Sequence, residues 1–196
     1  MLPVLLVGDS HLANISAARL HELEQLAGCA VVNGAVGGAD VHALGDQLAR
    51  FQPSGIVVVS VGTNDAAPWN CVPLAEFTAT LEQTLGGLGS CRVIFLASLG
   101  VDEARLMGSS DRLDEVMRRY ATAAMEVVRS HGGMVIDLVE ELSAIRSQAF
   151  EPDGVHLTTV AYDVVLRALG ERIATSQRSA DNVASSPVNG EDGCHE

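Results

Sequence analysis

The chain has 196 residues, enough for one domain with a sizeable core, and 47% of them are hydrophobic although only 4% are aromatic. The formal net charge is −13 and every basic residue is an arginine, which argues against nucleic acid or an anionic membrane as a partner. No apolar stretch reaches the roughly 18 residues of a spanning helix, and the N-terminus lacks the basic region of a signal peptide. We therefore expect a cytoplasmic protein without a membrane span.

The first predicted strand covers residues 4–7 and stops at Gly8. Asp9 and Ser10 follow, and a helix is expected over residues 12–27. A serine on such a strand-to-helix corner is lifted clear of the sheet, with free N–H groups of the helix close by. A nucleophile can be mounted there, although a serine that only caps a helix would occupy the same position.

Two further strands end in polar turns. Residues 29–33 form the second predicted strand, followed by the glycine-rich turn 34–38 and by a helix over 41–51 with one apolar face. Residues 56–61 are apolar almost throughout, as expected of a strand covered on both faces. This third strand ends at the sequence Gly62-Thr63-Asn64-Asp65.

The second half of the chain continues the alternation of helices and strands, after a loop over 66–73. Its predicted elements are a helix over 74–88, a strand over 92–97, a loop over 99–110, a helix over 113–128, a strand over 134–138, a short helical piece over 139–146, a loop over 150–156 and a last helix over 157–174. From residue 175 onward the sequence is polar and without periodicity. We therefore predict a folded domain over 1–174 and a disordered acidic tail over 175–196.

Five short strands that alternate with helices predict an α/β fold, a three-layer α/β/α sandwich with a parallel sheet. Right-handed crossovers leave few topologies, and we predict the flavodoxin-like strand order 2-1-3-4-5. In such a sheet the motifs at the carboxyl ends of the first three strands meet at one edge. We expect the motif Asp153 to His156, before the last helix, to join them there.

These motifs hold the groups that an acyl-transfer site requires. A serine hydroxyl such as that of Ser10 becomes a good nucleophile only when a base accepts its proton, and a neutral imidazole suits that role. His156 is the best candidate among the histidines, because Asp153 lies three residues earlier in a turn. The carboxylate can then orient the ring through Nδ1 and leave Nε2 facing Ser10.

Attack on a carbonyl also creates an oxyanion, which needs preorganised hydrogen-bond donors. The candidates are the N–H group of Ser10, the N–H group of Gly38 and the side-chain amide of Asn64. Gly37 is an alternative to Gly38, because either glycine allows the backbone to approach a substrate closely.

Two further residues are candidates for substrate binding. His11 either points into the pocket or solvates the first turn of its helix, and Trp69 is either a pocket wall or a hydrophobic plug. No cysteine lies in a C-x-x-C pair or a candidate motif, so we expect reduced thiols in or near the core and no metal site. The cysteines are Cys29, Cys71, Cys91 and Cys194.

The four motifs resemble those of the SGNH (GDSL) hydrolase family. The matching blocks are Gly8-Asp9-Ser10, residues 33–38, Gly62-x-Asn64-Asp65 and Asp153-x-x-His156, in that order. The resemblance spans residues 4 to about 174 and implies a flavodoxin-like sandwich that hydrolyses esters or thioesters, or transfers acyl groups, without a metal or other cofactor. It also implies Ser10 as nucleophile, His156 as base, Asp153 as its orienter, and Ser10, Gly38 and Asn64 as the oxyanion hole.

Two positions depart from the family pattern. His11 stands where many members have leucine, as in some carbohydrate-modifying relatives, and Ala161 stands where a glycine is frequent. Neither departure removes a catalytic group.

The favoured hypothesis is therefore a serine esterase that acts through an acyl-enzyme. Its partner would be a small-molecule substrate, an ester with a small or medium acyl group. The alternative is an acyltransferase that uses the same residues to move an acyl group to or from a sugar or another small hydroxyl acceptor. A non-catalytic binding domain is a third reading, but binding alone does not require a triad together with oxyanion donors. A dinucleotide-binding domain fits less well, because the turn 34–38 does not make the G-x-G-x-x-G fingerprint.

Overall fold

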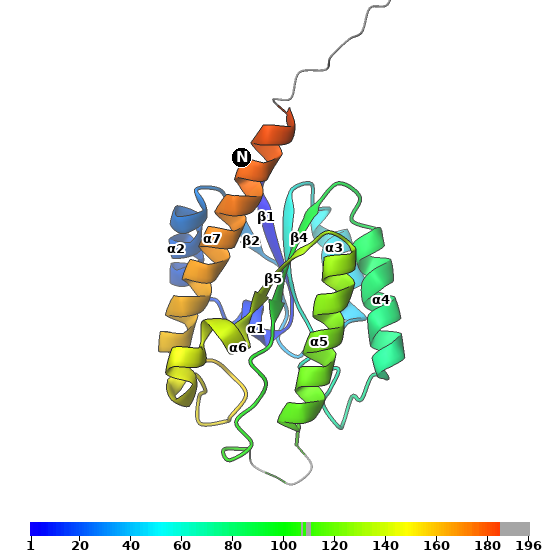
Figure 1. Ribbon diagram of the computed structural model, residues 1–196, viewed down its shortest axis with the longest axis vertical. Coiled ribbons are helices and arrows are strands. Elements are labelled where there is room, and N and C mark those ends of the chain that lie inside the picture. Colours follow the sequence, from blue (N-terminus) through cyan, green and yellow to red (C-terminus); the bar gives the residue numbers. More distant parts are fainter. Residues whose placement is uncertain (107, 109–110, 185–196) are drawn as a thin grey trace, which may run out of the picture.

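The computed structural model describes residues 1–106, 108 and 111–184, and in it a parallel sheet lies between two layers of helices (Figure 1). The sheet has five strands in the order β2-β1-β3-β4-β5, so the predicted α/β sandwich and strand order are confirmed. The strands are β1 Val4–Gly8, β2 Val31–Asn33, β3 Ile56–Ser60, β4 Arg92–Ala97 and β5 Met134–Asp137. Gly8 pairs with Ser60, so the two central strands end at the same level.

Helices cover both faces of the sheet (Figure 1). On one face are α3 Ala43–Phe51, α4 Leu74–Gly86 and α5 Asp114–Ser130. On the other are α1 Ser10–Ala13, α2 Ala17–Ala27, α6 Leu138–Glu141 and α7 Thr159–Ala184, with a 3-10 helix over Ser143–Gln148. Side chains alternate along each strand, so Leu5 and Val7 pack towards α3, α4 and α5, while Leu6 packs towards the opposite layer.

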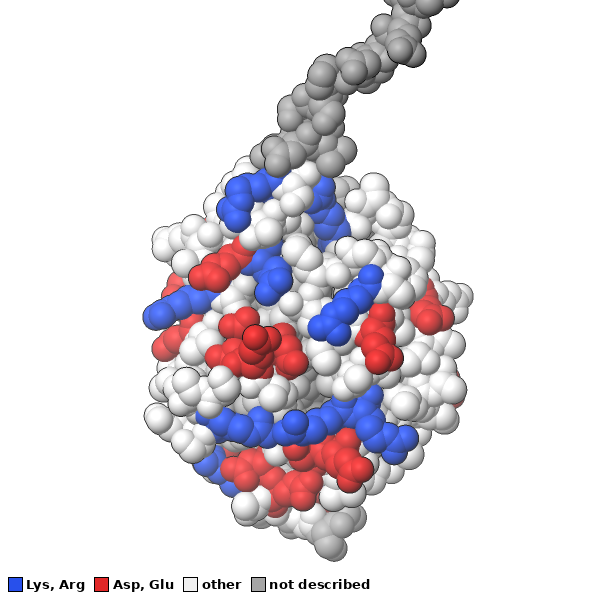
Figure 2. Space-filling model, viewed as in Figure 1, with Lys and Arg blue, Asp and Glu red and all other residues white. Residues whose placement is uncertain are grey.

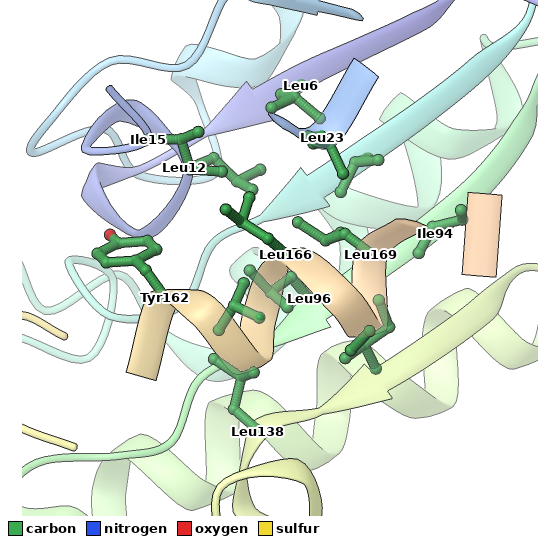
Figure 3. Packing of buried hydrophobic residues seen from close by; sticks show 14 of the residues in the cluster. Leu6, Leu12, Ile15, Leu23, Ile94, Leu96, Leu138, Tyr162, Leu166 and Leu169 are labelled. Carbon is green, nitrogen blue, oxygen red and sulfur yellow. The ribbon is translucent and has the colours of Figure 1, made fainter. Parts of the chain in front are cut away.

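The layer that holds α7 is packed by aliphatic side chains (Figure 3). Leu6 and Leu96 project from the sheet towards Leu166 and Leu169 of the helix, and all four are fully buried. Tyr162 lies one turn before Leu166 on the same face of α7 and reaches towards α1. The apolar stripe of α7 therefore fixes the start of this helix close to the end of β1.

The prediction of a single helix over residues 12–27 is wrong. The chain forms the short helix α1 at Ser10, breaks after Ala13, and starts again as α2. The break is stabilised by a new cap, because the Ser16 side chain accepts a hydrogen bond from the Arg19 N–H group at 3.4 Å. As a result Ser10 is the first residue of a helix, rather than part of a loop before one.

The last helix is also longer than predicted, because α7 continues to Ala184 and residues 175–184 are helical rather than part of a disordered tail. Tertiary contacts explain the extension. The Gln177 amide accepts from the Leu2 N–H group at 2.8 Å and donates to the Leu2 carbonyl at 2.7 Å, and Arg92 donates to the Ser176 carbonyl. The predicted tail over 185–196 lies outside the described residues.

Within the described part of the chain, none of the helices is both long and apolar enough to cross a membrane.

Cys29, Cys71 and Cys91 are free thiols, and Cys194 is outside the described residues. Cys29 and Cys91 are half-buried as expected, but Cys71 is exposed, which corrects its expected place in or near the core.

Candidate active site

The end of β1 is a sharp corner that only glycine fits. Gly8 has a φ of +123°, and a Cβ atom at this position would lie 1.9 Å from the Ser60 carbonyl oxygen. The side chain of Gln47 on α3 holds the same residue, because its Oε1 accepts from the Gly8 N–H group at 2.6 Å and its Nε2 donates to the Gly8 carbonyl at 3.1 Å. The backbone that leads into Ser10 is therefore fixed from both sides.

Asp9 holds the first turn of α1. Its Oδ1 atom accepts from the His11 N–H group at 3.0 Å, and the residue is fully buried. Ser10 follows as the first helical residue. From α7, in the same layer as α1, the Tyr162 hydroxyl donates to the His11 carbonyl at 3.0 Å. Burial raises the pKa of this hydroxyl, so it stays a neutral donor that ties α7 to the corner.

Ser10, His156 and Asp153 lie in one hydrogen-bonded chain. His156 Nε2 is 3.2 Å from Ser10 Oγ, although the two residues are 146 positions apart in sequence. His156 Nδ1 is 2.6 Å from Asp153 Oδ2 on the other side of the ring. An imidazole between a hydroxyl and a carboxylate can accept the hydroxyl proton while the carboxylate orients it.

The Asp153 carboxylate is ionised in this setting. Partial burial acts to raise its pKa, but hydrogen bonds from the His156 ring and from the N–H groups of Val155 and His156 outweigh burial and lower the pKa to about 2. A carboxylate that is charged at neutral pH favours the Nδ1–H tautomer of the ring. That tautomer leaves Nε2 free to accept a proton.

The loop that bears Asp153 and His156 is docked on the loop after β4. Gly154 has a φ of +72°, and a Cβ there would lie 2.6 Å from the Asp102 carbonyl oxygen. Asp102 donates its N–H to the Gly154 carbonyl at 2.8 Å. Arg105 reaches across and donates to the carbonyl groups of Phe150 and Ser147. His156 is thus positioned by contacts of its loop that lie outside the motif Asp153 to His156.

The glycine-rich turn passes beside Ser10. A Cβ added to Gly37 would lie 4.0 Å from Ser10 Cβ, and Gly38 has a φ of +82° with open space where a Cβ would be. Within the described residues, the N–H groups of Ser10, Gly37 and Gly38 have no acceptor in the protein. Free N–H groups beside a nucleophile are what an oxyanion requires.

Asn64 connects the turn after β3 to the glycine-rich turn. Its Nδ2 atom donates to the Ala39 carbonyl at 2.8 Å, and the residue is 9% exposed. Asp65 makes a second connection, since its two carboxylate oxygens accept from the N–H groups of Val41 and Gly62, each at 2.9 Å. Burial raises the pKa of Asp65 to about 6. These contacts give Asp65 a structural role, because one carboxylate joins the turn after β3 to the residues before α3.

The two substrate-binding candidates are placed differently from each other. The His11 side chain is 1% exposed and its Nδ1 lies 3.3 Å from Asp9 Oδ1, so it does not reach the surface beside Ser10. Neither alternative for His11 fits this burial, the side chain in the pocket or the side chain solvating the first turn, because the helix that starts at Ser10 turns the next residue into the interior. Trp69 is 64% exposed, with its ring 4.5 Å from the Arg112 guanidinium, so it is no buried plug.

Three residues of the site were missed by the sequence analysis: Gln47, Arg112 and Tyr162. Gln47 had a local signal, since it is the polar residue on the otherwise apolar face of α3 and is 6% exposed. Arg112 lies at the end of a loop without periodicity, and Tyr162 reads as one more core residue of α7. Only their partners in space distinguish these two residues.

A metal is not required for this arrangement, and within the described residues no cluster of three His, Cys, Asp or Glu side chains is suited to hold one. The groups present can activate a serine hydroxyl, orient the base and bind a developing negative charge. Those are the requirements for attack on an ester carbonyl.

Comparison with known proteins identifies the family and the fold. The family model described as GDSL-like Lipase/Acylhydrolase matches residues 6–164. No curated protein matches the chain in sequence. A solved lipase/acylhydrolase from Enterococcus faecalis superposes with a TM-score of 0.72 and 24% identity, over 88% of this chain and 97% of the other. An acetylxylan esterase from Geobacillus stearothermophilus superposes with a TM-score of 0.67 and 18% identity, over 88% and 94%. Both have the same fold as this chain.

Proposed function

This chain belongs to the GDSL-like lipase/acylhydrolase family and is therefore a hydrolase of ester bonds, and we propose that it is a serine esterase that forms an acyl-enzyme on Ser10. The observation that carries this proposal is the hydrogen-bonded chain from Ser10 Oγ to His156 Nε2 at 3.2 Å and from His156 Nδ1 to Asp153 Oδ2 at 2.6 Å. The proposed substrates are small or medium acyl esters or thioesters.

In the proposed mechanism His156 Nε2 accepts the proton of Ser10 as Oγ attacks the acyl carbon. The carbonyl oxygen becomes an oxyanion, bound by the N–H groups of Ser10 and Gly38 and by the Asn64 amide. The imidazolium, stabilised by Asp153, then gives its proton to the departing alcohol. A water molecule then gives a proton to His156 and attacks the acyl-enzyme. His156 returns that proton to Ser10 Oγ as the acid leaves.

Hydrolysis is favoured over transfer to a second alcohol by the openness of the base. The side chains of His156 and Asp153 are 40% and 48% exposed, so bulk water reaches the acyl-enzyme. An acyltransferase needs to exclude that water or to bind its acceptor tightly. Adding a sugar or a small alcohol during turnover checks this point, because an acyltransferase would form the new ester faster than the free acid.

Ser10→Ala tests the nucleophile. We expect the unmutated protein to be labelled by a fluorophosphonate at Ser10 and to cleave p-nitrophenyl acetate, and the variant to lose labelling and at least about a thousandfold in kcat. Ser179→Ala on the exposed side of α7 is the matched control and should retain both. A folded, unmutated protein that resists the label would overturn the proposal.

The substrate range can be read from a panel of p-nitrophenyl esters from C2 to C12. Trp69 and Val36 are large apolar side chains, 64% and 55% exposed, and they stand in the loops that carry Asn64 and the glycine-rich turn. We expect them to contact apolar parts of the ester. The acyl length with the highest kcat/KM then identifies the substrate class.

A further inference from the structure

Arg112 makes two parallel hydrogen bonds to the turn that carries Asn64. Its Nε–H group donates to the Thr63 carbonyl at 3.2 Å, and Nη2 donates to Asn64 Oδ1 at 3.4 Å. Nε and Nη2 lie on one edge of the planar guanidinium, so a single rigid group binds the backbone of one residue and the side chain of the next. A lysine, with one rotatable ammonium, lacks this geometry.

The remaining surfaces of the guanidinium are also occupied. Nη1 lies 3.3 Å from Asp111 Oδ1, and the group stacks over the Trp69 ring at 4.5 Å from its centroid. The Arg112 side chain is only 12% exposed, unlike Arg118, which is 48% exposed in its ion pair with Asp114. Figure 2 shows a band of arginine side chains above a group of acidic side chains towards the lower end of the molecule. Among the described residues, Arg112 is the arginine that is hydrogen-bonded to Thr63 and Asn64.

The contact to Asn64 fixes the orientation of its amide. Oδ1 accepts from Arg112 while Nδ2 donates to the Ala39 carbonyl at 2.8 Å, so a flip of the amide would place like groups against each other at both ends. One hydrogen of Nδ2 is left over, and no acceptor for it is found within the described residues. The positive charge of the guanidinium beside Oδ1 also polarises the amide and makes the free Nδ2 hydrogen a stronger donor.

We propose that Arg112 is the positioning residue of the oxyanion hole: it holds and polarises Asn64 so that the free Nδ2 hydrogen is ready when the oxyanion forms. This inference rests on the proposed function, in which Asn64 is an oxyanion donor. Arg112 brings the end of the loop before α5 against the turn after β3 and against Trp69. The strength of the third oxyanion donor therefore depends on the docking of a loop outside all four motifs.

Steady-state kinetics with p-nitrophenyl acetate separate this role from simple stability. For Arg112→Gln we expect kcat to fall about tenfold while KM changes less than about twofold, because the oxyanion contact is made in the transition state. Arg112→Lys keeps the charge but not the two parallel bonds, and we expect it to recover only part of the loss. Arg118→Gln, a second arginine at the same end, should retain the parent kcat.

A double-mutant cycle tests whether Arg112 acts through Asn64. In an Asn64→Ala background we expect Arg112→Gln to change kcat by less than about twofold, because the group it positions is already gone. The same fold loss in both backgrounds would overturn the proposal, as would an unchanged kcat in Arg112→Gln alone.

A spectroscopic readout keeps the test independent of esterase activity. Trp69 is the only tryptophan of the chain, so its fluorescence reports whether the stacking on Arg112 is lost. We expect the Asn64 side-chain NH2 resonances, assigned by their absence in Asn64→Ala, to move towards free-amide shifts in Arg112→Gln and to stay in place in Arg118→Gln. If the unmutated protein cleaved no ester, the proposed function would fail, but these resonances would still decide the positioning role. Unchanged Asn64 resonances in Arg112→Gln would overturn it.

Discussion

At the scale of single residues, His156 depends on Asp153 for its orientation. The carboxylate contacts the ring nitrogen at 2.6 Å and also accepts N–H groups of its own turn, so ring and backbone are held by one side chain. Because the pKa of Asp153 is lowered to about 2, its charge is present throughout the pH range in which a histidine can act as a base.

Asp153→Asn should therefore lower kcat for p-nitrophenyl acetate by roughly 10³- to 10⁴-fold, because an amide no longer favours the tautomer that leaves Nε2 free. Asp163→Asn on α7, whose side chain is 53% exposed, is the matched control and should behave as the parent. A kcat for Asp153→Asn equal to that of the control would contradict the triad.

His11 shows how a single helical step separates two neighbours. Ser10 is directed to His156, whereas the next side chain is buried against Asp9, and neither His11 Nε2 nor Asp9 Oδ2 has a hydrogen-bond partner within the described residues. The histidine in the first motif therefore belongs to the interior of the corner.

At the scale of elements, the corner after β1 is held by α3, which lies on the face of the sheet opposite to α1. The Gln47 amide on α3 binds both backbone groups of Gly8, at 2.6 and 3.1 Å, in the manner of a neighbouring strand. This contact places α3 against the end of β1, two residues before Ser10. The bond to the Gly8 N–H group takes the place of a ladder hydrogen bond, whereas the Gly8 carbonyl also accepts from the Val36 N–H group at 2.9 Å.

Gln47→Leu leaves the Gly8 N–H group buried without a partner, and we expect the free energy of unfolding to fall by about 1–3 kcal/mol. We also expect kcat to fall several-fold, because Ser10 follows two residues later. Urea unfolding and ester hydrolysis measure the two effects. Gln83→Leu on the exposed side of α4 serves as control. Equal stability of the two variants would show that the Gln47 hydrogen bonds to Gly8 do not stabilise the fold.

At the scale of the whole molecule, Asp65 connects segments from both sides of the site. Its carboxylate joins the turn after β3 to the residues that precede α3, and burial raises its pKa from 3.8 to about 6. The folded protein thus binds this proton more tightly than the unfolded chain does. The contribution of Asp65 to stability is complete below about pH 4 and is lost as the pH rises through 6.

The urea midpoint should therefore decrease between pH 4 and 8. The part due to Asp65 corresponds to a loss of at most about 3 kcal/mol in the free energy of unfolding for a pKa shift of this size. In Asp65→Asn that decrease should disappear, although the variant is less stable overall because an NH2 group faces an N–H donor. Asp46→Asn on the exposed side of α3 should keep the parent profile. An identical pH profile for Asp65→Asn and the parent would show that Asp65 does not titrate in this range.

The sequence by itself determined the layers, the strand order and the edge at which Ser10, Asn64 and His156 gather. These features depend on local patterns, namely apolar runs of strand length, glycines at their ends and apolar periodicity in the helices, and the crossover rule converts them into a topology. Asp153 was found for the same reason, because its partner lies three residues away in one turn.

Only the tertiary structure decided what depends on partners far apart in the chain. Gln47, Arg112 and Tyr162 act on Gly8, Asn64 and His11 across 39 to 151 positions, and no local pattern encodes such pairs. The length of α7 was decided in the same way. Residues 175–184 have the composition of a tail, but Ser176 and Gln177 bind Arg92 and Leu2, and those contacts extend the helix.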